Sequence, residues 1–150
     1  MSKISLLSII IIASLLNSCG FHTPTKNTPL NAIITSTDNN TFAVELKKRF
    51  NQEAVQSLII QIGREVSKKQ TASYKSNGET DSYTLSLSVP IKVFNSKNKL
   101  LLSQDIMANT HLNKMSFAQA DRLQIAESYK QLRNTIIKKL LRRLNRLNEN

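Results

Sequence analysis

YTLSLSVPIKV, residues 83–93, is the clearest period-two run in the chain. Its apolar members are Tyr83, Leu85, Leu87, Val89, Ile91 and Val93, and they alternate with Thr84, Ser86, Ser88, Pro90 and Lys92. Because successive side chains of a strand point to opposite faces, this pattern predicts a strand with one buried face and one open face. Pro90 cannot donate to a ladder, so the middle of this strand lies at an edge, at a bulge, or with that backbone position turned away from its neighbour.

Turns and further strands flank this run on both sides. Ser76–Gly78 predicts a tight turn, because Asn and Gly tolerate positive φ. Asn95–Lys99 predicts a second turn, and residues 100 to about 112 a third strand of the same meander. Before the first turn, Leu58–Ile62 is strongly strand-forming, and the polar stretch Val66–Tyr74 is expected to continue it as an exposed arm.

The N-terminal part of the domain predicts a strand followed by a helix. Ala32–Thr35 is a short β-branched run, and Asp38–Asn40 is typical of a turn and a helix cap. The helix is expected to run from Thr41 to about Ser57. Its apolar residues fall four apart, at Phe42, Leu46, Phe50 and Ala54.

A long second helix closes the chain. Ser116 and Gln119 form a candidate capping box. Apolar residues then recur at three- and four-residue steps, at Ile125, Tyr129, Leu132, Ile136, Leu140, Leu144 and Leu147. The whole order predicts an α+β two-layer sandwich, with an about four-stranded, mostly antiparallel sheet covered by two helices.

Chain length limits the number of domains, and net charge limits the kind of partner that the protein can bind. The chain has 150 residues, and removal of a predicted signal at 1–18 leaves 150 − 18 = 132, which suits one domain at 31–150. Lys and Arg number 21 against 10 Asp and Glu; without Lys3 the balance is 20 − 10 = +10. We therefore expect an anionic partner. Anionic lipid or phosphorylated glycolipid fits an exported chain better than nucleic acid does.

The first eighteen residues predict an export signal. Lys3 supplies a positive charge, and Ile4–Leu16 is an apolar run of 13 residues, too short to span a bilayer comfortably. The alternative is an uncleaved anchor. Leu16-Asn17-Ser18-Cys19 resembles the bacterial lipobox, although Asn17 is less usual there.

The resemblance implies that Cys19, which is the one cysteine of the chain, carries lipid. Gly20 follows instead of Asp, which in such lipoproteins points to the outer membrane. Residues 19–30 contain Pro24 and Pro29 among polar residues, and this composition predicts a tether between lipid and domain.

Few residues suggest catalysis. The histidines, His22 and His111, are far apart in sequence, and only three glycines are present, which makes a nucleotide-binding loop hard to build. Asp81 and Asp105 could face one another across a hairpin, but polar strand faces carry carboxylates routinely. We therefore expect no enzymatic activity, no cofactor and no metal.

Basic residues are better candidates for a functional site than the histidines or carboxylates, and they form two groups. The basic helix face comprises Lys138, Lys139, Arg142, Arg143 and Arg146. It is either the solvated back of a packed helix or a surface for phosphates or an acidic partner. The second group, Lys68, Lys69 and Lys75, flanks the Asn-Gly turn, where lysines either contact a ligand or protect a strand edge from aggregation.

Taken together, these residues resemble the lipopolysaccharide-assembly lipoprotein family LptE. The matching stretches are Cys19–His22, Thr41–Ser57, Tyr74–Tyr83 with its basic Asn-Gly hairpin, Ala126–Tyr129, and the basic, leucine-containing finish at 138–144. The chain departs from the family at Thr23-Pro24, where Leu-Arg is common, and it lacks a long polar tail.

The resemblance implies a non-enzymatic outer-membrane lipoprotein of lipopolysaccharide transport. It would face the periplasm, lie partly within the lumen of an LptD-type β-barrel as plug and assembly partner, and bind lipopolysaccharide. The basic hairpin position of the family falls on Lys75; Lys68, Lys69 and Lys114 are added from charge and placement. The alternative is an outer-membrane lipoprotein that binds peptidoglycan or an envelope protein complex through the basic helix face.

Overall fold

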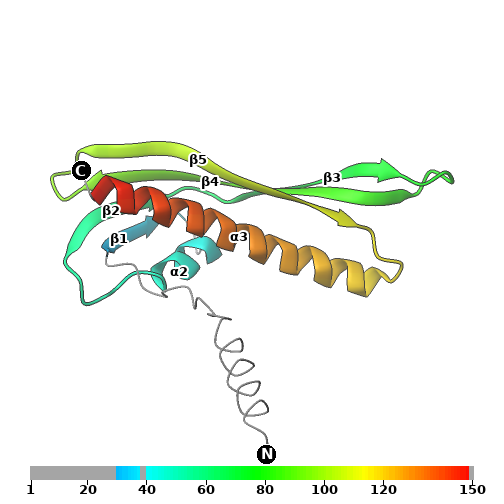
Figure 1. Ribbon diagram of the computed structural model, residues 1–150, viewed down its shortest axis with the longest axis horizontal. Helices are drawn as coiled ribbons and strands as arrows, with labels where there is room; N and C mark the ends of the chain where they lie inside the picture. The colour runs from blue at the N-terminus through cyan, green and yellow to red at the C-terminus, as the bar shows by residue number, and fades with distance from the viewer. Residues whose placement is uncertain (1–29, 38–39, 149–150) are drawn as a thin grey trace, which may run out of the picture.

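The computed structural model describes residues 30–37 and 40–148 (Figure 1). The predicted export signal, the lipidation site Cys19 and the tether up to Pro29 lie outside these residues. The elements in chain order are β1 (Asn31–Ser36), α2 (Thr41–Lys47), β2 (Gln56–Ile62), β3 (Val66–Tyr74), β4 (Thr80–Asn95), β5 (Leu100–Asn113) and α3 (Ala118–Asn148). Among the described residues, no helix combines the length and the apolar character that a membrane crossing needs.

The sheet is organised around β4, its longest strand. β5 pairs antiparallel along one side of β4. On the other side, β3 pairs with residues 80–88 and β2 with residues 91–95, both antiparallel, while β1 adds in parallel to β2. Both helices lie on one side of the sheet, so the fold is the expected α+β two-layer arrangement (Figure 1). The sheet has five strands rather than about four.

The additional strand arises because the run from residue 58 to 74 is interrupted at 63–65. The Gly63 N–H donates to the Pro90 carbonyl at 2.8 Å, and a Cβ at Gly63 would lie 3.0 Å from the Pro90 Cβ. This contact would be tighter than most Cβ contacts in proteins, so a larger residue would require Pro90 to shift by a few tenths of an ångström. β2 therefore ends against the middle of β4, and β3 begins as a separate strand beyond the junction.

Pro90 sits where a missing N–H costs no ladder bond. Its carbonyl faces Gly63, and the N–H and C=O of one residue in an antiparallel strand point to the same side. The donor position of Pro90 thus faces the junction between β2 and β3 and turns away from its β5 neighbour Asp105. This matches the third of the options that the sequence left open.

Helix α2 is shorter than predicted, since it ends at Lys47 instead of near Ser57. The Asn40 side chain caps it by accepting from the Phe42 N–H at 2.9 Å, as the sequence suggested. Its far end is set by contacts distant in sequence: the Asn51 N–H donates to the Leu30 carbonyl, and the Asn31 side chain donates to the Ala54 carbonyl at 2.8 Å. These bonds turn the chain back toward β2 before a longer helix can form.

The core lies between the sheet and α3. The helix buries Leu132, Ile136, Ile137, Leu140 and Leu144 against the alternating apolar face of β4, from Tyr83 to Val93. Burial of each such aliphatic side chain contributes roughly 1.5–3 kcal/mol, so this helix face supplies a large part of the contact between the two layers. Phe42 and Leu46 of α2, which are fully buried, add to the same core. The helix runs to Asn148, as its unbroken periodicity predicted.

Candidate functional site

The arm, defined as β3, the turn at 75–79 and residues 80–88 of β4, projects as one end of the molecule (Figure 1). The Lys75 N–H donates to the Glu79 carbonyl at 2.8 Å, and the Gly78 N–H donates to the Lys75 carbonyl at 2.9 Å. Gly78 has φ +83°, a conformation that glycine adopts at no steric cost. The turn therefore fixes the backbone of Lys75 at the tip while its side chain stays exposed.

Lys68 and Lys69, although adjacent, lie on opposite faces of the arm. Lys69 pairs in register with the buried Leu85, and its Nζ lies 4.6 Å from the centroid of the Tyr83 ring. This is a cation–π contact on the helix side of the sheet. Lys68 pairs with Ser86 on the open face, and its carbonyl accepts from the Tyr129 hydroxyl of α3 at 2.9 Å.

Lys114 follows β5 and lies at the same end of the sheet as Lys75. Its N–H donates to the Asp81 carbonyl at 2.8 Å, so it continues the β4–β5 ladder by one step. Lys75 and Lys114 therefore flank the first residues of β4 from its two sides. Of the four predicted lysines, Lys75 lies in the turn at the tip and Lys114 lies level with Asp81 after the end of β5. Lys68 and Lys69 lie on opposite faces of the arm.

Two residues that sequence reasoning missed connect the arm to the start of α3. The Tyr83 hydroxyl lies 3.5 Å from Asp121 Oδ2, and Asp121 Oδ1 accepts from the Met115 N–H at 2.9 Å. Burial first, and then the negative charge of Asp121, raise the pKa of Tyr83 above its usual 10. Asp121, rather than the predicted pair Ser116 and Gln119, closes the loop that leads into this helix.

A partly buried ion pair fixes the junction from which the arm departs. Arg133 of α3 donates two hydrogen bonds to the Glu65 carboxylate, from Nη2 to Oε1 at 2.7 Å and from Nε to Oε2 at 2.8 Å. The hydrogen bonding to Glu65 raises the pKa of Arg133 further. Such bidentate geometry holds the segment between β2 and β3 against the helix.

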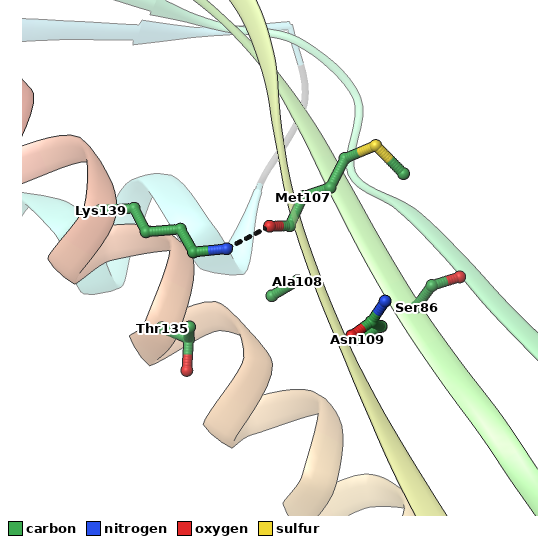
Figure 2. Close-up of a pocket in the computed structure, with 6 residues that line it drawn as sticks. All are labelled: Ser86, Met107, Ala108, Asn109, Thr135 and Lys139. Atoms are coloured by element: carbon green, nitrogen blue, oxygen red, sulfur yellow. Dashed lines mark hydrogen bonds between the residues drawn. The ribbon is translucent and has the colours of Figure 1, made fainter.

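The second predicted group, the basic helix face, borders a groove along β5. Lys139 Nζ donates to the Met107 carbonyl at 2.7 Å (Figure 2). A cavity of about 270 Å³ lies next to this bond, lined by Asp105, Ile106, Met107, Lys139, Arg142, Arg143 and Arg146. Lys138, in contrast, is not among the residues that line the groove. Four of the five predicted residues of this face are therefore brought together.

Two neighbouring cavities extend this groove in both directions. One, of about 210 Å³, continues from Lys139 past Thr135 to Asn109 (Figure 2). The other, of about 230 Å³, continues from Arg143 and Arg146 to Leu102 and Leu147. We call the whole channel, from residues 102 to 109 of β5 and from Thr135 to Leu147 of α3, the basic groove.

Metal-binding geometry is not found in the described part of the chain. Within residues 30–37 and 40–148, no group of three or more His, Cys, Asp or Glu side chains is arranged to hold a metal ion. His111 instead makes a 3.0 Å hydrogen bond through Nδ1 with the Thr84 hydroxyl across the β4–β5 ladder. Asp81 and Asp105, for which the sequence left open a position facing one another across a hairpin, fall at different levels of that ladder, because Asp105 pairs with Pro90.

Comparison with known proteins gives a family and a fold. The family model LptE, described as lipopolysaccharide-assembly, matches residues 30–145. The crystal structure of rare lipoprotein B from Shewanella oneidensis is similar at a TM-score of 0.68 and 13% identity, covering 78% of this chain and 95% of that one. The solution structure of lipoprotein B from Nitrosomonas europaea is similar at 0.62 and 20% identity, covering 79% and 84%. At these identities the two structures establish the fold alone. A search among curated proteins found no match.

Proposed function

The chain belongs to the LptE lipopolysaccharide-assembly family, and from this premise we propose that it is the plug and assembly partner of an LptD-type outer-membrane β-barrel. In this proposal it is anchored through lipid on Cys19 with its domain partly inside the barrel lumen, and it binds lipopolysaccharide. The protein holds and guides the lipid and performs no chemistry on it.

The observation that carries lipopolysaccharide binding is the geometry of the arm. Lys75 and Lys114 are exposed at the same end of the sheet, and no ion pair is found for either within residues 30–37 and 40–148. Lys69 adds a charge on the helix side of the arm, where the Tyr83 ring holds its ammonium in place. Cations at such positions can meet the phosphates of a glycolipid without first breaking an internal pair.

The test of the barrel partnership is a pull-down from detergent-solubilised outer membranes with a C-terminally tagged protein, followed by mass spectrometry. We expect a large β-barrel protein of the LptD type in roughly equal amount. Abundant, lipidated bait without a barrel would contradict the proposal. Retention on cell-wall sacculi would then favour the alternative, in which the basic groove serves a cell-wall or envelope partner.

The test of the lipid site is charge reversal on the arm. Lys75→Glu together with Lys69→Glu should weaken lipopolysaccharide binding by about tenfold or more, since two attractive charges become repulsive. Binding is measured with the purified protein and labelled lipopolysaccharide at fixed salt. The Lys97→Glu, Lys99→Glu double variant is the matched control, because both are exposed lysines in the turn at the opposite end of β4. Equal binding by the arm variant and the control would remove both arm lysines from the site.

A further inference from the structure

β5 is an edge strand, and its outer side carries unused backbone groups. Among the described strands it pairs only with β4. The bond from Lys139 Nζ to the Met107 carbonyl shows that the backbone of Met107 points away from β4. Backbone groups of alternate residues point the same way, so Asp105 and Asn109 also face outward. An open edge of this kind is a template for another extended chain.

The basic groove runs along this same edge and has the length of a short peptide. Residues 102–109 of β5 extend over about 25 Å. On the helix side, Lys139 and Arg143 are four residues apart, a rise of about 6 Å. Side chains on one face of a strand repeat every ~6.6 Å. Alternate carboxylates on an extended segment would therefore meet successive cations of the helix.

We propose that the basic groove binds an extended acidic segment of another protein, which adds as a strand to the free edge of β5. Its backbone bonds to Asp105, Met107 and Asn109, and its carboxylates pair with Lys139, Arg142 and Arg143. Lys139 moves from the Met107 carbonyl to a carboxylate when the segment arrives. The arm lysines take no part, so this inference does not depend on lipopolysaccharide binding or on a barrel partner.

Charge decides between this occupant and a second copy of the chain. Edge-to-edge pairing of two β5 strands would bring two sets of groove cations together, and like charges in close contact oppose pairing. Lys139 also occupies the Met107 carbonyl, so a strand without a carboxylate to receive Lys139 pairs less readily with this edge. Negative carboxylates remove this obstacle, so the groove selects acidic segments.

The first test uses a labelled nine-residue peptide of alternating Glu and Val, with blocked ends, and the full-length lipidated protein in zwitterionic micelles. Fluorescence anisotropy should show binding that falls at least tenfold in the Arg142→Glu, Arg143→Glu double variant. The Lys130→Glu, Lys138→Glu double variant is the matched control, because it also reverses two exposed charges on the same helix but outside the groove. It should remain within about twofold of the original. An equal loss in this control would overturn the proposal.

The second test separates strand addition from simple charge attraction and needs no variant protein. The same peptide, N-methylated at every second residue, keeps its carboxylates but loses the donors of one edge, and should bind at least tenfold more weakly. Hydrogen exchange should slow at the outward amides of Asp105, Met107 and Asn109 when the unmodified peptide binds. Equal binding of the methylated peptide, preference of the groove for anionic phospholipid vesicles, or dimerisation of the protein would each overturn the proposal.

Discussion

The two halves of β4 have the same alternating pattern but serve different purposes. Residues 91–95 pair with β2, whose Leu58, Ile60 and Ile62 are buried, whereas residues 80–88 pair with β3, where every residue except Ser73 is exposed. The apolar face of β4 is buried throughout, in one core cluster with side chains of both helices. The neighbouring strand therefore decides whether a stretch of sheet contributes to the core or leaves polar side chains exposed to solvent.

The largest expected difference between the halves comes from removing a core side chain. Leu140→Ala opens a cavity under the sheet at a fully buried site, and should lower the free energy of unfolding by about 3 kcal/mol. Chemical denaturation measures this loss. Thr71→Ala, at an exposed site of β3, is the comparison and should stay within about 0.5 kcal/mol. Equal losses would mean that the arm is part of the core.

The junction between the halves should show the next largest effect. Arg133→Ala leaves Glu65 without its bidentate partner at a site where both side chains are mostly buried, and should cost about 2 kcal/mol. Lys130→Ala, which removes a pair between exposed side chains with Glu127, should cost well under 1 kcal/mol by the same denaturation measurement. If the two variants lose the same stability, the Arg133–Glu65 pair contributes no more than an exposed ion pair.

The tip of the arm should show a smaller and local effect. Gly78→Ala places a side chain at φ +83°, and should cost about 1 kcal/mol even though nothing lies within 4 Å of the new Cβ. The expected signature is faster amide exchange at 75–79 with little change in global unfolding. Ser76→Ala, in the same turn, should not show it. A global loss from Gly78→Ala would show that the arm and the covered half unfold as one unit.

Tyr83, where the arm meets the helix, gives the smallest predicted effect, and it depends on pH. Its raised pKa means that the folded state resists loss of the phenolic proton. The corresponding stability is present below pH 10 and is lost as the pH rises above 10 through the folded-state pKa. Tyr83→Phe should therefore lose less stability than the original between pH 10 and 11. Tyr74→Phe, on an exposed tyrosine, controls for the lost hydroxyl.

Much of this fold could be predicted because its local patterns agree with its tertiary contacts. The alternation at 83–93 identified the buried face, and Asn77-Gly78 placed Lys75 at a tip. The early end of α2 has two causes. One is bonding to Leu30 and Asn31, about twenty residues away, which no local pattern encodes. The other is a local turn in which the Asn51 side chain accepts from the Glu53 N–H, and this signal was present in the sequence. The break at Gly63 depends on its contact with Pro90, which no local pattern encodes.

The candidate site was only partly predictable for related reasons. Adjacent lysines in a strand must face opposite ways, so the separation of Lys68 from Lys69 was available from alternation alone. The position of Lys69 above Tyr83 depends on the β3–β4 register, which shifts at residues 71–74 and cannot be counted from the turn. The contact of Lys139 with β5 is purely tertiary, so the sequence revealed the helix charges but not the groove.

The length of β4 sets the distance between the tip of the arm and the opposite end of the sheet. Its sixteen residues extend over about 50 Å, which exceeds the ~30 Å hydrocarbon thickness of a bilayer. Lys75 at the tip is thus held at a fixed distance from the end of the sheet that carries β1. Adding two residues to each strand of the arm would move the tip by about 7 Å and keep every side chain on its face. Adding one would exchange the faces, so the reach of the arm can change only in steps of two.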